Sequence, residues 1–193
     1  MVSGQVNPDY ILPWLGEHSI IVEVGAYRGE WVYEVATRYP TSTVHAFEPA
    51  TLALKFLREK VGGLENVIIH PVGLDTADRE ATLHNCHRDG ASVYATIGES
   101  ETVQCIDAAQ AIDDLAPIDL MHMNAEGAEL DILDYLITIG CITKVKRIML
   151  QWHPGNCSGS LKIGQVEKQL LNTHIKQGGY RAWGLYLLRD GNL

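Results

Sequence analysis

The residues best suited to chemistry stand where short apolar runs of the sequence end. Gly25 and Gly29 follow the run at residues 19–24, and Glu48 follows the run at residues 43–47, 23 residues after Gly25. Glycines at such a turn let a ligand approach the backbone. A carboxylate about 20 residues later can accept hydrogen bonds from both ribose hydroxyls of a nucleoside. The spacing predicts a nucleoside site; the alternatives are a tight turn and an exposed acid at a helix start.

The glycine pattern decides which nucleoside fits this site. A dinucleotide fingerprint, G-x-G-x-x-G, would need glycines where the chain has Tyr27 and Glu30, and no phosphate-binding G-x-x-x-x-G-K-[ST] motif occurs. S-adenosylmethionine carries no phosphate, and its sulfonium and α-amino groups suit the nearby acid Glu23. We therefore predict a methyl donor as the cofactor. Asp75, after the run at residues 66–72, is a further candidate for the adenine, with the backbone of residues 73–74 as the alternative.

A second group of polar residues follows two later apolar runs. Asn124, Glu126 and Glu129 come after residues 118–123, and His153 closes residues 147–152. Methylation of a hydroxyl needs a nearby base, and an imidazole that titrates near neutrality suits that role. We expect these four residues to be catalytic. The alternatives are an acidic first helical turn and a histidine that only packs against a loop, and we expect His122 to be a buried structural residue.

Three motifs resemble those of the FkbM family of S-adenosylmethionine-dependent methyltransferases. They are Val24-Gly25-Ala26-Tyr27-Arg28-Gly29, Phe47-Glu48-Pro49 and Asn124-Ala125-Glu126-Gly127-Ala128-Glu129, and the resemblance covers about residues 20–180. The family usually has V-G-A-N-x-G and D-x-E-G-x-E, so Tyr27 and Asn124 depart from its commonest pattern. The resemblance implies O-methylation of a hydroxyl on a sugar, a polyketide or a related small molecule, possible glycans included. The expected cofactor contacts are Glu23, Gly25, Ala26, Tyr27, Gly29, Glu48 and Asp75.

Other reactions fit the sequence less well. Methylation of nucleobase amino groups would need a D/N-P-P-Y/F box where the chain has residues 124–127, and C5 methylation would need a Pro-Cys dipeptide, which the chain lacks. Metal-assisted O-methylation through Asn124, Glu126 and His153 stays open, although we expect no metal. A non-catalytic nucleoside-binding or scaffold protein also stays open, because of Tyr27 and Asn124.

The elements that must position these residues alternate between β-type and helical patterns. Helical spacing at residues 30–38, 51–60, 128–139 and 161–176 separates near-continuously apolar runs, and Gly178-Gly179 should end the last helix. Residues 81–85 and 102–106 predict a small β excursion. This pattern predicts an α/β, doubly wound and mostly parallel sheet, a Rossmann-like methyltransferase fold. We expect one domain over residues 1–193, with a cofactor half at about 19–80 and an acceptor half at about 81–190.

The charge and cysteine content of the chain indicate which classes of binding partner and which compartment to expect. The 193 residues carry a formal net charge of −9, a field that repels phosphate backbones and anionic membrane surfaces, so we expect neither nucleic acid nor a membrane as a partner. The four cysteines are widely spaced, and we expect them to be reduced thiols. With no signal-type N-terminal region and no long apolar stretch, we expect a cytoplasmic protein.

Overall fold

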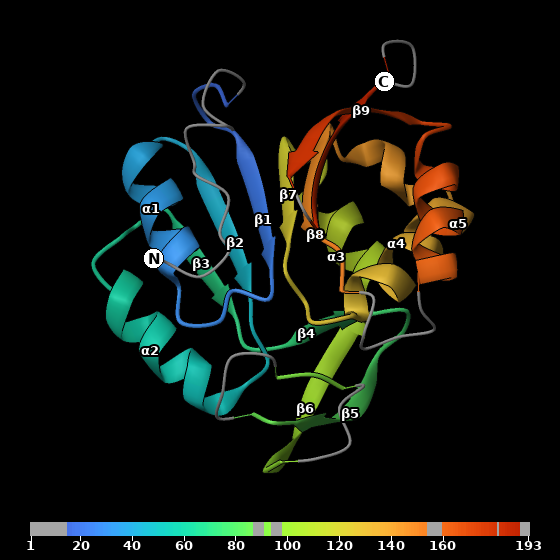
Figure 1. Ribbon diagram of the computed structural model, residues 1–193. Helices are drawn as coiled ribbons and strands as arrows, with labels where there is room; N and C mark the ends of the chain where they lie inside the picture. Colours follow the sequence, from blue (N-terminus) through green and yellow to red (C-terminus); the bar gives the residue numbers. More distant parts are fainter. Residues whose placement is uncertain (1–14, 87–90, 94–97, 154–159, 181, 190–193) are drawn as a thin grey trace.

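A seven-stranded sheet forms the centre of the protein (Figure 1). The computed structural model describes residues 15–86, 91–93, 98–153, 160–180 and 182–189. The strand order is β3-β2-β1-β7-β8-β10-β9. The bounds of these strands are β1 Ile20–Val24, β2 Thr43–Phe47, β3 Val67–His70, β7 Leu120–Met123, β8 Arg147–Gln151, β9 His174–Tyr180 and β10 Trp183–Leu188.

The pairing of these strands confirms the predicted doubly wound, mostly parallel sheet. Strand β1 pairs in parallel with both β2 and β7, and β3 and β8 continue the parallel sheet on either side. Strand β10 runs antiparallel to β8 and to β9. The direction of winding reverses between β1 and β7. In open α/β sheets, ligands bind beyond the carboxyl ends of the strands at such a switch point.

Helices cover both faces of the sheet because successive strand residues point to opposite sides. Val22 and Val24 belong to an apolar cluster that includes residues of α3, α4 and α5. Ile21 and Val44 belong to a second cluster, which includes residues of α1 and α2. The helices are α1 Glu30–Arg38, α2 Thr51–Val61, α3 Ala108–Leu115, α4 Ala128–Thr138 and α5 Ser160–Leu170.

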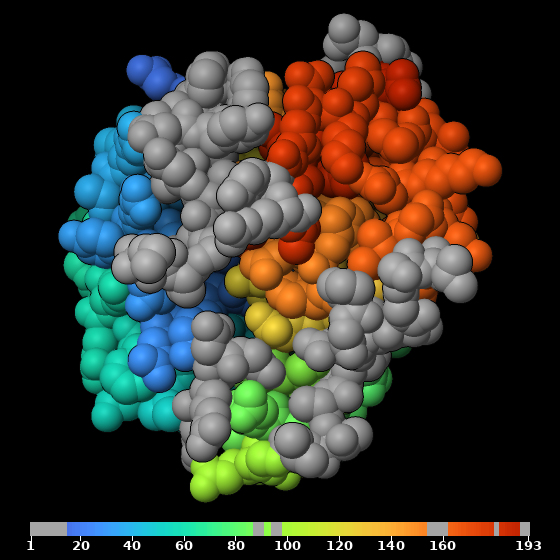
Figure 2. Space-filling model, viewed as in Figure 1, coloured from blue at the N-terminus to red at the C-terminus, as the bar shows by residue number. Residues whose placement is uncertain are grey.

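A three-stranded sheet in the order β4-β6-β5 lies below the carboxyl ends of β1 and β2 in Figure 1. Its strands are β4 Gly73–Asp75, β5 Arg79–His84 and β6 Ser100–Asp107, which confirms the predicted β excursion. Figure 2 shows the blue and cyan residues of the first half on one side, orange and red residues on the other, and the green residues of the small sheet beneath them. The small sheet therefore closes the end of the molecule at which the site is expected.

One prediction about an individual element is wrong, and one helix was missed. The helix expected at residues 161–176 ends at Leu170, and the chain then forms β9, in which Gly178 and Gly179 pair with Leu185 and Gly184 of β10. Backbone pairing at the sheet edge replaces the helical turn that the spacing indicated. Helix α3 was not predicted, although Asp107 is its N-cap and accepts hydrogen bonds from the backbone N–H groups of residues 109 and 110.

No helix in the described ranges has the length and apolar character needed to cross a membrane. Cys86, Cys105 and Cys141 are buried free thiols, and Cys157 lies outside the described residues.

The side chain of Asn66 ties the end of α1 to the start of β2. Its Nδ2 group lies 3.1 Å from Ala36 O, 3.1 Å from Tyr39 O and 3.0 Å from Ser42 O. Asn66→Ala leaves these carbonyl groups without their donor and is expected to lower the free energy of unfolding by about 1–3 kcal/mol in urea denaturation. The control Asn172→Ala removes an exposed amide and is expected to change it by less than about 0.5 kcal/mol. Equal effects of the two substitutions would contradict this role of Asn66.

Candidate active site

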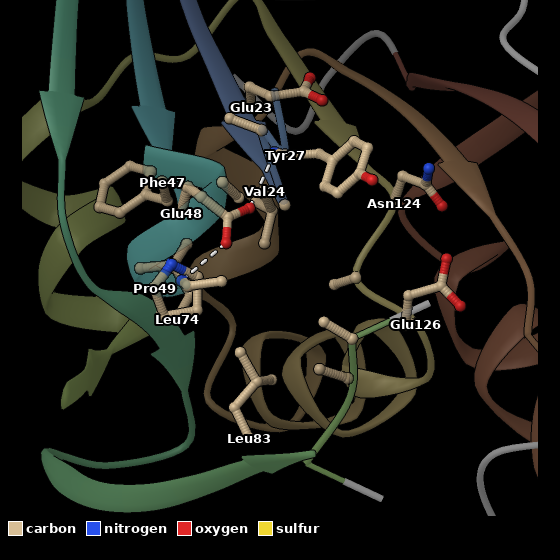
Figure 3. Close-up of a pocket in the computed structure, with 18 of the residues that line it drawn as sticks. Glu23, Val24, Tyr27, Phe47, Glu48, Pro49, Leu74, Leu83, Asn124 and Glu126 are labelled. Atoms are coloured by element: carbon tan, nitrogen blue, oxygen red, sulfur yellow. Dashed lines mark hydrogen bonds between the residues drawn. The ribbon is translucent and has the colours of Figure 1, made fainter. Parts of the chain in front are cut away.

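A cavity of about 510 Å³ lies at the carboxyl ends of β1, β2 and β7. The ends of these strands supply its polar wall, and Leu74, Leu83 and Val103 of the small sheet are among its apolar residues (Figure 3). Members of both groups of polar residues singled out in the sequence therefore line one cavity, whereas Gly29, Glu129 and His153 do not line it. The sheet topology brings them together, since parallel strands end at the same edge.

The loop after β1 leaves no room for side chains at its first glycine. Gly25 has φ +84°, and a Cβ atom there would lie 2.3 Å from the backbone oxygen of Asn124. The backbone N–H groups of Gly25 and of the buried Ala26 both donate to Phe47 O at 3.0 Å. The loop is thus fixed to β2 on one side and to the end of β7 on the other. Gly29 has φ +82° and is the N-cap of α1.

Glu48 is buried at the end of β2 and holds two backbone segments. Its Oε2 accepts a hydrogen bond from Tyr27 N at 2.7 Å, and its Oε1 accepts one from Ala50 N at 2.8 Å. Burial raises the pKa of Glu48 to about 7, although these two bonds oppose the shift. The side chain lines the cavity, as Figure 3 shows, so the alternative of an exposed acid at a helix start is wrong. Each carboxylate oxygen has a second lone pair with which to bind a ligand.

Tyr27 lies beside Glu48 in a left-handed conformation, with φ 49°. Its side chain packs against the apolar cluster of the small sheet, and the guanidinium of Arg28 lies 5.1 Å from the ring centre. In Figure 3 the ring extends toward Asn124. The backbone N–H group of Tyr27 therefore binds Glu48, and its ring forms part of the cavity wall.

Glu23 and His122 form a buried pair at the back of the cavity. Glu23 Oε2 lies 2.6 Å from His122 Nδ1, and both residues line the cavity. The burial of His122 is as predicted. Its bond to Glu23 was not predicted, because the register that places the two residues opposite each other on β1 and β7 cannot be read from one sequence.

Glu129 and His153 form a second pair, at the start of α4 and the end of β8. Glu129 Oε1 accepts hydrogen bonds from the backbone N and the Nδ1 of His153, both at 2.9 Å, and Glu129 Oε2 accepts one from Gly127 N at 3.0 Å. Glu129 is completely buried. His153 Nε2 lies 3.5 Å from Glu126 Oε1. Because an ionised carboxylate only accepts, Nδ1 carries the proton toward Glu129, and Nε2 is the nitrogen that can take up another.

The surroundings of His153 favour its protonated form. Burial lowers the pKa of His153, but the hydrogen bond to Glu129 and the charges of Glu129 and Glu126 outweigh burial, so the pKa is raised above its ordinary value. Glu126 and Asn124 line the cavity, whereas His153 lies behind Glu126 and does not line it. The predicted catalytic residues are therefore brought together, and Glu126 and Asn124 are the two that line the cavity.

Asp75 also lines the cavity, but its carboxylate already has partners. Asp75 Oδ2 lies 2.6 Å from Arg79 Nη2, and Oδ1 accepts a hydrogen bond from Thr76 N at 2.7 Å. Gly73 and Leu74 line the same wall. The backbone alternative for the adenine contact therefore fits the geometry better than the Asp75 carboxylate does.

Two further features of the site were not predicted. Ser92 Oγ donates a hydrogen bond to Glu126 O at 2.8 Å, which ties part of the loop between β5 and β6 to the start of α4. Asn124 Oδ1 is buried and has no hydrogen-bond partner within the described part of the chain. Among the residues that the structure describes, no group of three or more His, Cys, Asp or Glu side chains could hold a metal ion.

Comparisons with known structures agree with this arrangement at the level of the fold. The fibrillarin pre-rRNA processing protein of Methanococcus jannaschii is 12% identical, with a TM-score of 0.58 over 89% of this chain and 67% of that one. An rRNA methylase of Streptococcus thermophilus is 11% identical, with a TM-score of 0.55 over 94% of each chain. TrmK of M. capricolum, in complex with S-adenosyl-homocysteine, is 8% identical, with a TM-score of 0.52 over 95% of this chain and 67% of that one.

No curated protein matches the chain. The methyltransferase FkbM domain matches residues 23–181, a span that includes the glycine loop, Glu48, Glu126 and His153. The chain therefore belongs to the FkbM family of methyltransferases, whose methyl donor is S-adenosylmethionine.

Proposed function

We propose that the protein transfers a methyl group from S-adenosylmethionine to a hydroxyl of a small molecule, with sugars as the first class to test. The observation that carries the proposal is the His153–Glu129 pair behind Glu126 at the cavity wall. A buried carboxylate that orients an imidazole is a recurrent way to build a general base. An acceptor with a hydroxyl needs such a base, because its proton must leave as the new oxygen–carbon bond forms.

The first part of the cavity fits the methyl donor. Gly25 and Ala26 line the cavity without a large side chain, and the Glu48 carboxylate can accept hydrogen bonds from ribose hydroxyls. Leu74 and Pro49 offer apolar contacts for an adenine beside it. The donor supplies a methyl group on a sulfonium cation, which the protein does not have to activate.

The second part of the cavity would receive the acceptor. Glu126 would accept a hydrogen bond from the acceptor hydroxyl, and the proton would pass to the group formed by Glu126, His153 and Glu129 during transfer. The buried Oδ1 of Asn124 has no hydrogen-bond partner in the described ranges, and it would accept a second hydrogen bond from the acceptor. The residues of this chain thus orient the hydroxyl and take its proton.

A small molecule is favoured over RNA as the acceptor. The structural neighbours include an rRNA methylase and a pre-rRNA processing protein, but at 11–12% identity they share only the fold with this chain. The net charge of −9 would repel a phosphate backbone. The test is transfer of a labelled methyl group to a panel of hydroxylated sugars and other small molecules, with RNA as a comparison. Transfer to RNA only would contradict the proposed acceptor class.

Two alternatives make different predictions in the same assay. A scaffold that has lost its chemistry would bind S-adenosylmethionine weakly or methylate no acceptor. Metal-assisted transfer through Asn124, Glu126 and His153 would require a divalent cation, and a chelator would abolish turnover.

The affinity for the donor should depend on the ionisation of Glu48. Its ionised form accepts hydrogen bonds from ribose hydroxyls, and its pKa is about 7, so the ionised fraction rises between pH 6 and pH 8. Calorimetry with S-adenosylhomocysteine should show affinity rising by roughly five- to tenfold over this range. Glu48→Gln should bind more weakly and lose most of this pH dependence. A parent protein with a flat profile would contradict the ribose role.

The turnover should depend on His153. His153→Ala is expected to lower kcat by about 10²–10⁴ while the affinity for S-adenosylhomocysteine stays nearly unchanged. The parent rate should rise with pH through an ionisation above the ordinary histidine value, because the deprotonated base is the active form and its pKa is raised. The variant should lack this ionisation. His18→Asn, at an exposed position, is the matched control and should keep the parent rate. Unchanged turnover in His153→Ala would remove His153 from the mechanism.

Glu126 should matter more for turnover than for stability. Its side chain is 23% exposed at the cavity, so Glu126→Gln is expected to change the free energy of unfolding by less than about 1 kcal/mol. The substitution should lower kcat by at least about tenfold and move the pH profile to lower pH, because the Glu126 charge helps to raise the pKa of His153. The exposed Glu34→Gln serves as the control. A large loss of stability with full activity per folded molecule would show that Glu126 is structural.

A further inference from the structure

The Glu23–His122 pair has a geometry that packing does not explain. Both side chains are at most 3% exposed, and 2.6 Å separates Glu23 Oε2 from His122 Nδ1. The imidazole lies between two indoles, at 4.2 Å from the ring centre of Trp31 with an interplanar angle of 7°, and at 5.1 Å from that of Trp183 with an angle of 16°. The stacked rings leave the imidazole little freedom to turn.

The second ring nitrogen of His122 differs from that of a structural histidine in the same sheet. His122 Nε2 is buried and has no hydrogen-bond partner among the residues that the structure describes. In His174, which is also completely buried, Nδ1 lies 2.9 Å from Thr173 Oγ1 and Nε2 lies 3.0 Å from Val145 O. Leaving a buried polar atom without a partner is costly, so a histidine kept for packing is expected to resemble His174. In His122, by contrast, only Nδ1 is hydrogen-bonded, and its partner is Glu23.

The two carboxylate oxygens of Glu23 have different surroundings. Its Oε2 is bonded to His122, while its Oε1 accepts no hydrogen bond from the described residues. Figure 3 shows the Glu23 carboxylate at the upper edge of the cavity, on the side where Asn124 lies. Burial raises the pKa of Glu23, and the charge and hydrogen bond of His122 oppose that shift. His122 therefore favours a charged carboxylate with one oxygen available for a ligand.

We propose that His122 is a positioning residue that holds Glu23 as the receptor for the α-ammonium group of the donor's amino-acid end. The proposal rests on the donor site described above. With the ribose at Glu48, just after β2, the donor would cross Gly25, just after β1, toward β7, and its amino-acid end would reach Glu23. An ammonium group offers hydrogen bonds and a positive charge, which a fixed carboxylate oxygen in a buried site binds well.

The test compares two ligands that differ in the amino-acid end. S-adenosylhomocysteine carries it, whereas 5′-methylthioadenosine has the same nucleoside and sulfur without it. His122→Phe keeps a ring between the two indoles and removes the bond to Glu23. Calorimetry should show at least a tenfold weaker affinity for S-adenosylhomocysteine and a change of less than twofold for 5′-methylthioadenosine. Glu23→Gln should give the same selective loss.

Two further measurements separate positioning from folding. Because His122 acts through Glu23, the double variant Glu23→Gln/His122→Phe should bind no more weakly than Glu23→Gln. His174→Phe should lower the melting temperature without changing the ratio of the two affinities. If His122→Phe does not fold, His122→Gln replaces it in the same comparison.

The outcomes distinguish this proposal from the donor site itself. Equal losses for both ligands, unchanged affinity for S-adenosylhomocysteine, or additive effects in the double variant would overturn the role of His122 and leave the donor site standing. A parent protein that binds neither ligand would overturn the donor site, and the role of His122 with it.

Discussion

The close contact between Gly25 and the backbone oxygen of Asn124 is the constraint on which the rest of the site depends. It joins the loop after β1 to the segment after β7 at the switch point of the sheet, where a side chain at position 25 would collide with the backbone. The backbone N–H group of Asn124 also donates to Val24 O at 3.0 Å, and this bond holds the two segments together. In the proposed function, methyl transfer needs the donor carbon and the acceptor atom in line, and a fixed junction between the two parts of the cavity would supply this alignment.

Three buried carboxylates hold the segments around this junction. Glu48 accepts hydrogen bonds from one backbone N–H group in the loop after β1 and from another just before α2. Glu129 binds Gly127 and His153, and Glu23 binds His122. A buried carboxylate is costly unless hydrogen bonds or an opposite charge compensate it. Each of the three has such partners, and each partner belongs to the cavity wall or lies directly behind it. The hydrogen bonds that offset the cost of burying these carboxylates therefore also fix the shape of the site.

The sequence predicted what depends on local pattern and missed what depends on register. The strand-end positions of Gly25, Glu48 and Glu126 followed from apolar runs and turn residues, and the fold followed from their alternation with helices. The pairs Glu23–His122 and Glu129–His153 join residues 99 and 24 positions apart, so their contacts depend on strand order and register. Strand β9 was missed for the same reason, because pairing with β10 decides the conformation of a segment whose local spacing also fits a helix.

The two departures from the commonest family pattern fit the geometry at their positions. Residue 27 has φ 49°, a conformation that Asn adopts more readily than Tyr, and the bond from Tyr27 N to Glu48 helps to hold it there. The Tyr27 ring also adds apolar surface to the cavity wall. At position 124, an aspartate would add a negative charge next to Glu126 and Glu129, which already raise the pKa of His153. The neutral Asn124 avoids a further shift of that kind. The pKa of His153 would therefore be raised less than with an aspartate at position 124, which suits the proposed role of His153 as a base.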